Sequence, residues 1–127
     1  AKILPDEPVR VMGDRMRIEQ VLVNLLRNAI DATKSEAHPE IEIILASGET
    51  AVLSVRDNGH GIEDFDALFE PFYTTKQPGD GTGLGLAISS GIVAELGGRL
   101  TARNGAEGGA VFEMQLPILN DRPAAAE

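Results

Sequence analysis

The stretch DNGHG at residues 57–61 is the first of two glycine clusters, and GTGLGL at residues 81–86 is the second. Neither cluster ends in Gly-Lys-Ser or Gly-Lys-Thr, so a lysine-anchored phosphate loop is absent. The second cluster runs directly into an apolar series that is typical of a helix. A glycine loop that opens onto a helix offers backbone N–H groups and the positive end of the helix dipole to an anion. We therefore expect phosphate groups to bind at residues 81–86.

The composition predicts one folded domain. The chain has 127 residues, of which 43% are hydrophobic, and it contains no cysteine. Disulfides and thiolate metal sites are therefore excluded, and a reducing compartment is expected. No apolar run approaches the ~20 residues of a membrane span. We expect a domain over residues 1–117, a disordered tail or linker over 118–127, and a cytoplasmic location without direct membrane contact.

The formal net charge is −9. Such a surface repels nucleic acid and anionic membranes at long range. It also repels a nucleotide, which must then be held by local geometry and a cation. The charge therefore argues against a nucleic-acid partner.

Periodicity and turn residues predict two helices and two hairpins. Asp14 is a good N-cap for an amphipathic helix that continues to about residue 33. The expected strands are 9–12, 40–46, 51–57, 99–103 and 110–116, and the expected second helix is 84–96. Residues 58–83 are expected to form a long loop, which in a compact domain is usually a functional lid. With too few βαβ units for a parallel sheet, we expect an α/β (α+β) fold, a mixed, mostly antiparallel sheet with the helices on one face.

Asp57 breaks the apolar pattern of its strand. It shares a face with Ala51, Leu53 and Val55, so its carboxylate points toward the core, where an unpaired charge is costly. The exocyclic amine of adenine would satisfy such an acceptor, and Gly59 and Gly61 would let a flat ring approach the backbone. The alternative is common: a strand-ending Asp that caps its own turn.

A polar band flanks the apolar stripe of the first helix. It consists of Gln20, Asn24, Asn28 and Asp31. Asn is a poor helix-interior residue, and Asn28 lies nearest the buried edge. Its amide oxygen is a suitable ligand for Mg²⁺. A solvated helix face is sufficient to explain Gln20 and Asp31.

The segment Phe69–Lys76 holds three of the five aromatic residues. These side chains either plug the core or anchor a lid over a nucleotide. Thr75 and Lys76 can reach phosphate, although a solvated lysine is the alternative. His38 and His60 lack a carboxylate placed to orient them, and both are expected on the surface.

Taken in order, these motifs resemble the catalytic ATP-binding domain of bacterial sensor histidine kinases, of the superfamily that includes gyrase, heat-shock chaperones and mismatch-repair ATPases. Asn24-Leu25-Leu26-Arg27-Asn28-Ala29 resembles the N box, and residues 57–62 and 81–86 resemble the two glycine boxes. Phe69-Glu70-Pro71-Phe72 resembles the F box, and residues 105–117 resemble the last glycine-and-strand element. Any one box is weak, whereas five in order are specific.

The resemblance implies a two-layer α/β sandwich, the Bergerat fold, with ATP between the two long helices under a lid. It implies Asn28 as the Mg²⁺ ligand, Asp57 as the adenine anchor, and Gly83, Leu84 and Gly85 as backbone donors to the phosphates. The candidate ATP-binding residues are Asn24, Asn28, Asp31, Asp57, Gly59, Gly61, Ile62, Phe72, Tyr73, Thr75, Lys76, Gly81, Thr82, Gly83, Leu84, Gly85, Leu86 and Ala110.

Asn24 and Asn28 are the candidate catalytic residues. ATPases of the superfamily place a Glu one turn before the Mg²⁺ ligand, where this chain has Asn24, which cannot act as a general base. The resemblance thus implies slow hydrolysis and transfer of the γ-phosphoryl group to a His on a separate dimeric helical hairpin, then to a response-regulator aspartate. The isolated domain is expected to be monomeric. Two alternatives are a serine kinase or nucleotide-sensing module of the same superfamily, and an interaction domain with a decayed pocket.

Overall fold

The computed structural model describes residue 11, residues 14–70 and residues 85–118, and these contain two helices and four strands. In chain order the elements are α1 (Arg15–Ala32), β1 (Ile41–Ser47), β2 (Thr50–Asp57), α2 (Gly85–Glu95), β3 (Arg99–Asn104) and β4 (Ala110–Pro117). Each agrees within a residue or two with the element that the sequence predicts. The first residue of the predicted second helix, Leu84, lies outside the described residues.

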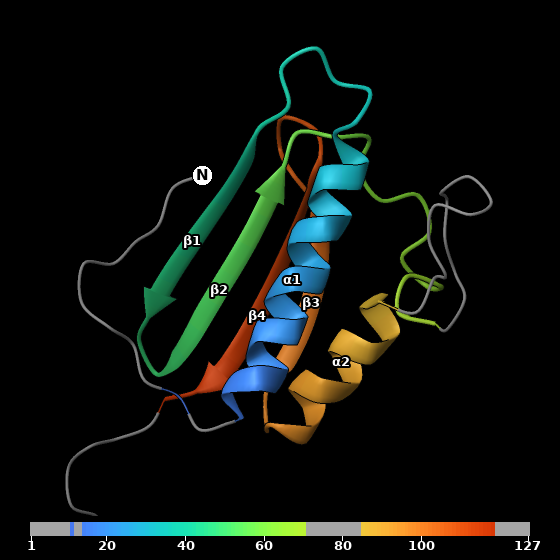
Figure 1. Ribbon diagram of the computed structural model, residues 1–127. Coiled ribbons are helices and arrows are strands. Elements are labelled where there is room, and N and C mark those ends of the chain that lie inside the picture. The colour runs from blue at the N-terminus through green and yellow to red at the C-terminus, as the bar shows by residue number, and fades with distance from the viewer. Residues whose placement is uncertain (1–10, 12–13, 71–84, 119–127) are drawn as a thin grey trace, which may run out of the picture.

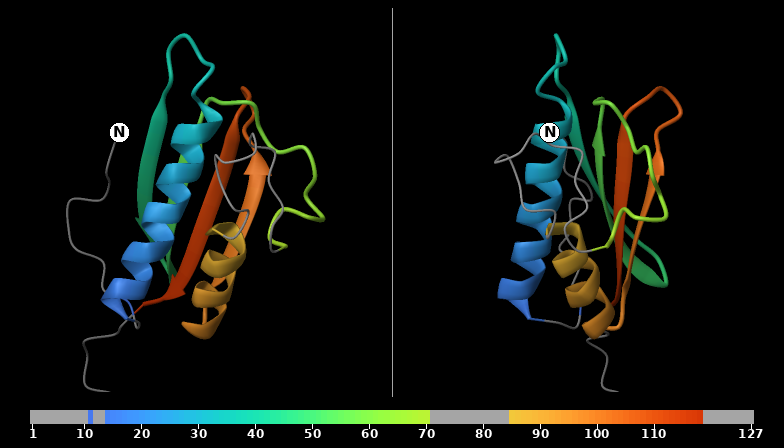
Figure 2. Two further views of the ribbon diagram at one scale, coloured as in Figure 1. Left: turned by 45° about the vertical axis from the view of Figure 1, so that its right-hand side comes forward. Right: turned by 90° about the vertical axis from the view of Figure 1, so that its right-hand side faces the viewer.

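The four strands form one sheet in the order β1-β2-β4-β3, and every neighbouring pair is antiparallel. Both helices cover the same face of the sheet, as Figures 1 and 2 show. The predicted two-layer architecture is confirmed, with the described strands antiparallel throughout. Because β2 and β4 are the central strands, their side chains on the helix-covered face of the sheet lie beneath the helices.

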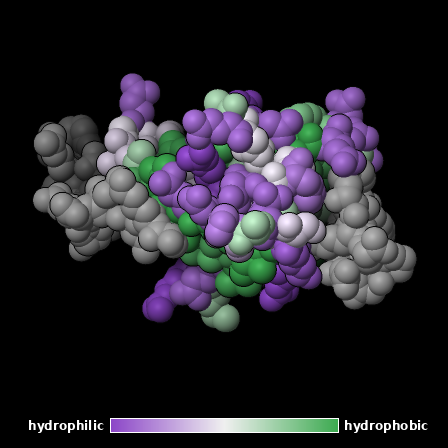
Figure 3. Space-filling view, turned by 90° about the horizontal axis from the view of Figure 1, so that it is seen from above, coloured by the Kyte–Doolittle hydropathy of each residue, from purple (hydrophilic) through white to green (hydrophobic). Residues whose placement is uncertain are grey.

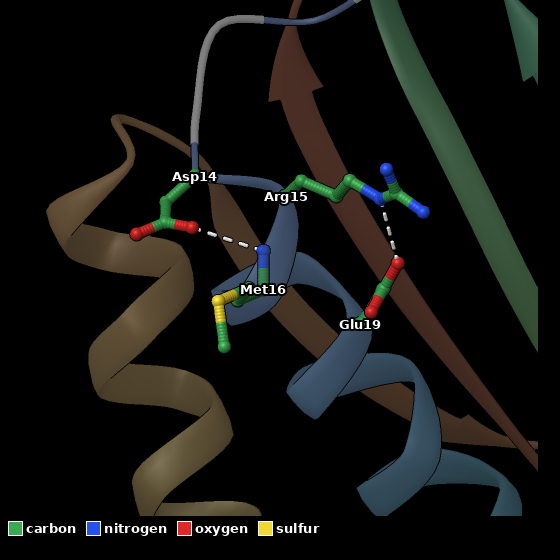
Figure 4. A network of polar contacts seen from close by, with 4 residues as sticks. All are labelled: Asp14, Arg15, Met16 and Glu19. Carbon is green, nitrogen blue, oxygen red and sulfur yellow. Dashed lines mark hydrogen bonds and ion pairs between the residues drawn. The ribbon is translucent and has the colours of Figure 1, made fainter.

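Helix α1 begins where its capping residue predicts. The Asp14 carboxylate accepts a hydrogen bond of 2.9 Å from the backbone N–H of Met16, and Arg15 pairs with Glu19 one turn further on at 3.0 Å (Figure 4). The cap satisfies one of the N–H groups that have no partner within the helix. At the other end the buried Thr33 hydroxyl donates to the carbonyl of Ala29 at 3.0 Å.

The core lies between the helices and the central strands. From α1 it takes Val21, Leu25 and Ala29, which recur every four residues and so lie on one face of the helix. Alternate residues of β4 contribute Ala110, Phe112, Met114 and Leu116, and the other members are Val55, Leu68, Ile92, Val93 and Leu100. The alternation of a half-buried strand therefore sets which side chains the sheet presents to the helices.

The two ends of the described chain meet. Val11 forms an isolated antiparallel bridge with Ile118. The fold thus includes Ile118, which the sequence analysis assigns to the tail. The remainder of the tail lies outside the described residues, and so do residues 9, 10 and 12 of the predicted first strand.

Candidate functional site

Asp57, the last residue of β2, is a buried carboxylate with one partnered and one unpartnered oxygen. Its side chain is on the core face, as predicted, and the residue is 2% exposed. Oδ1 accepts hydrogen bonds from the N–H of Gly59 at 2.9 Å and from the N–H of Ala110 at 3.3 Å. Oδ2 is buried and has no hydrogen-bond partner among the described residues.

The turn interpretation of Asp57 is confirmed for Oδ1, whereas the ligand interpretation stays a prediction that concerns Oδ2. The Oδ1 contact with Gly59 is the local turn that a strand-ending Asp makes. The Oδ2 atom can only accept, and leaving a buried acceptor without a donor is costly. An exocyclic amino group of a ligand, as in adenine, fits this requirement.

The loop after Asp57 packs closely against the end of α1 at Gly59 and against the end of β3 at Gly61. A Cβ atom at Gly59 would lie 2.2 Å from the carbonyl oxygen of Ala32, and one at Gly61 would lie 2.9 Å from Oδ1 of Asn104. The sequence analysis predicts that these glycines make room for a flat ring. The packing of the protein itself already requires them, and their role in ATP binding stays a prediction.

Asn58 ties the same loop to the segment that precedes β1. Its Oδ1 accepts from the N–H of Glu40 at 2.8 Å, and its Nδ2 donates to the carbonyl of His38 at 2.8 Å. Seen from the end of the molecule at which this loop lies, the surface is mainly hydrophilic, with hydrophobic side chains visible between (Figure 3). The sequence analysis did not single out the Asn58 side chain, because a turn residue carries no signal for a contact 18 positions away.

Asn104, at the end of β3, is a second residue that sequence reasoning missed. Its Oδ1 accepts from the N–H of Ile62 at 2.7 Å, and its Nδ2 donates to the carbonyl of the same residue at 3.3 Å. The side chain of Asn104 thus takes the place of a neighbouring strand for the Ile62 backbone. Ile62 itself is partly buried and packs against the core.

Asn24 connects α1 to the beginning of α2. Its Nδ2 donates to Oγ of Ser89 at 3.1 Å and to the carbonyl of Gly85 at 3.4 Å. The structure therefore brings the predicted residues Asn24 and Gly85 together. A Cβ at Gly85 would approach Cγ of Asn24 to 3.9 Å, which is ordinary contact.

Asn28 and Asp31 lie further along the same side of α1, and both are partly buried. The Asn28 side chain makes no hydrogen bond with the described residues, so its amide oxygen is available to a ligand. Asp31 forms an ion pair with Lys34 at 3.1 Å. No group of three His, Cys, Asp or Glu side chains that could hold a metal ion occurs in the described part of the chain. A metal here would take few protein ligands, as Mg²⁺ bound to phosphates and water does.

The remaining predicted residues divide into three groups. Ile62 and Leu86 pack against the core, and Phe69, from the aromatic segment, does the same. His38 and His60 are exposed, as predicted. The following lie outside the described residues: Phe72, Tyr73, Thr75, Lys76, Gly81, Thr82, Gly83 and Leu84.

Residues 13–120 match the family described as histidine kinase-, DNA gyrase B-, and HSP90-like ATPase, so this two-layer fold is that of an ATPase-type domain. The chain belongs to that family. It is 44% identical over 118 residues to the C4-dicarboxylate transport sensor protein DctB of Pseudomonas aeruginosa, covering 89% of this chain and 19% of DctB. The chain thus spans about a fifth of the length of that relative.

Solved structures show the same similarity. The catalytic domain of histidine kinase ThkA, in a nucleotide-free form, aligns with a TM-score of 0.77 and 38% identity over 91% of this chain and 76% of that one. Full-length ShkA in complex with AMPPNP aligns with a TM-score of 0.74 and 30% identity over 89% of this chain and 24% of ShkA. The chain corresponds to the catalytic ATPase domain of sensor histidine kinases, and the similarity does not favour the serine-kinase or nucleotide-sensing alternative. No helix in the described ranges is long and apolar enough to span a membrane.

Proposed function

We propose that this domain binds MgATP beside α1 and α2 and donates the γ-phosphoryl group to a histidine on a separate helical domain of the same kinase. The observation that carries the nucleotide half of the proposal is Oδ2 of Asp57, which is buried without a donor. A ligand amine at this atom removes the cost of the unpaired acceptor. Family membership and the similarity to sensor proteins support the phosphoryl-transfer half.

Each described residue has a distinct part in this proposal. Asp57 accepts from the adenine amine while Gly59 and Ala110 hold its other oxygen in place. Asn28, whose amide is uncommitted, supplies one oxygen to Mg²⁺. ATP supplies the phosphoryl group when bound. The backbone N–H groups and the helix dipole at the beginning of α2 would favour binding of its phosphates there.

Asn24 explains why transfer to a protein is favoured over hydrolysis. An amide cannot accept a proton from water at neutral pH, so the domain lacks a general base at this position. The Asn24 side chain instead donates to α2. Phosphoryl transfer depends mostly on positioning and on electrostatic stabilisation, which a correctly placed acceptor domain provides.

The partners we propose are the helical dimerisation domain that carries the phosphoacceptor histidine, and the receiver domain of a response regulator. The domain itself acts in the cytoplasm as a monomer, without nucleic acid and without direct membrane contact. The net charge of −9 is consistent with a protein partner rather than a nucleic acid.

Calorimetry with MgATP tests the nucleotide half. The wild-type domain is expected to bind, Asp57→Ala is expected to lose binding, and Asp66→Ala, which removes an exposed carboxylate, is the matched control. Absence of binding to the wild type, or unchanged binding to Asp57→Ala, rejects the proposal. Mixing the domain with a histidine-bearing helical hairpin and radiolabelled ATP tests the second half, since acid-labile phosphate on the hairpin is the expected product.

A further inference from the structure

The first glycine loop is held at both ends by one strand pair. At its beginning, the N–H of Ala110 on β4 donates to Asp57. At its end, the Asn104 amide on β3 binds both backbone groups of Ile62. Ala110 and Asn104 are themselves register partners across the β3–β4 hairpin.

From this geometry we infer that Asn104 is a positioning residue for the base of the nucleotide. This inference rests on the proposed function and extends it to a residue outside the recognised motifs. The Asn104 side chain does not itself contact the ligand. It fixes the Gly61–Ile62 segment relative to the Asp57 carboxylate, so that the surface on which the base rests exists before the base arrives.

Two features show why this contact is specific to Asn104. The two hydrogen bonds use the donor and the acceptor of one side-chain amide, and only Asn and Gln carry both in this form. Gly61 adopts a φ of +80°, and a Cβ there would lie 2.9 Å from the Asn104 oxygen. The close approach of the loop to Asn104 therefore depends on the absence of a side chain at Gly61.

The expected consequence is a loss of preorganisation. Without the Asn104 amide, no other hydrogen bond within the described residues holds the Ile62 N–H and carbonyl, and ligand binding must then supply the ordering of the loop. Because the loop lies at the base end of the site, the loss applies equally to every ligand that contains adenosine. A defect at the phosphate end would instead affect only the triphosphate.

The test compares Asn104→Ala with Thr101→Val, a near-isosteric change on the same strand but on the opposite face of the sheet. Removing two exposed hydrogen bonds is expected to weaken the binding of adenosine and of MgATP alike, by about fivefold. Thr101→Val is expected to bind as the wild type does. Hydrogen exchange at the Ile62 amide should accelerate in Asn104→Ala only, which a general loss of stability would not produce at one amide.

Binding of Asn104→Ala within a factor of about two of the wild type, or a loss confined to MgATP, overturns the inference and leaves the proposed function intact. Failure of the wild type to bind overturns the proposed function and the inference with it. Should Asn104→Ala not fold, Asn104→Asp decides, because its carboxylate keeps the acceptor for the Ile62 N–H and loses the donor to the carbonyl. Weaker adenosine binding with a protected Ile62 amide supports the inference, and unchanged affinity overturns it.

Discussion

The amide of Asn24 on α1 donates a hydrogen bond of 3.1 Å to the hydroxyl of Ser89 on α2, and Ser89 is fully buried. A second bond runs from the same amide to the carbonyl of Gly85 at 3.4 Å. One side chain therefore connects the middle of α1 to the first turn of α2. Since Asn28 lies one turn further along α1, this contact sets the distance between the proposed metal ligand and the proposed phosphate-binding end of α2.

Removal of either partner is expected to destabilise the fold. Asn24→Ala leaves the buried Ser89 hydroxyl without its partner on α1, and the expected loss is about 1–3 kcal/mol of the free energy of unfolding. Urea denaturation of Asn24→Ala, Ser89→Ala and the double variant measures the coupling. Ser90→Ala is the matched control, because Ser90 lies on the same helix but is only partly buried. Strictly additive losses would show that the bond contributes nothing.

Asp57→Asn is expected to change which base is bound. Oδ1 of residue 57 must still accept from Gly59 and Ala110, so the new amide nitrogen takes the place of Oδ2. The new N–H donor then faces the amine of adenine, which is also a donor. The carbonyl oxygen of hypoxanthine could instead accept a hydrogen bond from it. The ratio of ATP to ITP affinity should fall at least about fivefold, since a mismatched buried polar pair costs ~1–3 kcal/mol. Competition binding measures this ratio, with Asp66→Asn as control. An unchanged ratio contradicts the placement of the base at Asp57.

Gly109→Ala is expected to destabilise the protein more than Gly108→Ala. Both glycines have positive φ, +74° at Gly109 and +103° at Gly108, so both substitutions carry backbone strain. Only at Gly109 does a Cβ also meet another chain segment, 1.9 Å from the carbonyl oxygen of Asp57, while nothing lies within 4 Å at Gly108. The difference between the two melting temperatures isolates the steric part. Equal destabilisation would show that the close packing of Gly109 against the Asp57 backbone does not contribute to stability.

The sequence predicts those parts of the fold that are governed by local periodicity. The apolar stripe of α1 and its Asp14 cap predict a helix within one residue of its observed bounds, and the alternation in β2 predicts the burial of Asp57. The contacts of Asn58 and Asn104 are different, because they join residues 18 and 42 positions apart. A turn-forming Asn has the same local pattern whether its amide meets solvent or a distant backbone. The true reason for Gly59 is likewise nonlocal, because it depends on where α1 ends.

Asn28→Ala is expected to remove the dependence of ATP affinity on Mg²⁺ without loss of stability. The Asn28 side chain makes no hydrogen bond with the described residues, so its removal breaks no hydrogen bond among them. Alanine is also the better helix former, by up to ~0.7 kcal/mol, so the free energy of unfolding should stay equal or rise slightly. Titrations of wild type and variant with ATP, each with Mg²⁺ and with EDTA, measure the increment that the metal adds. The wild type should bind more tightly with Mg²⁺, and the variant equally in both conditions. An undiminished increment would exclude Asn28 as the ligand, and a global loss of structure would make it a packing residue instead.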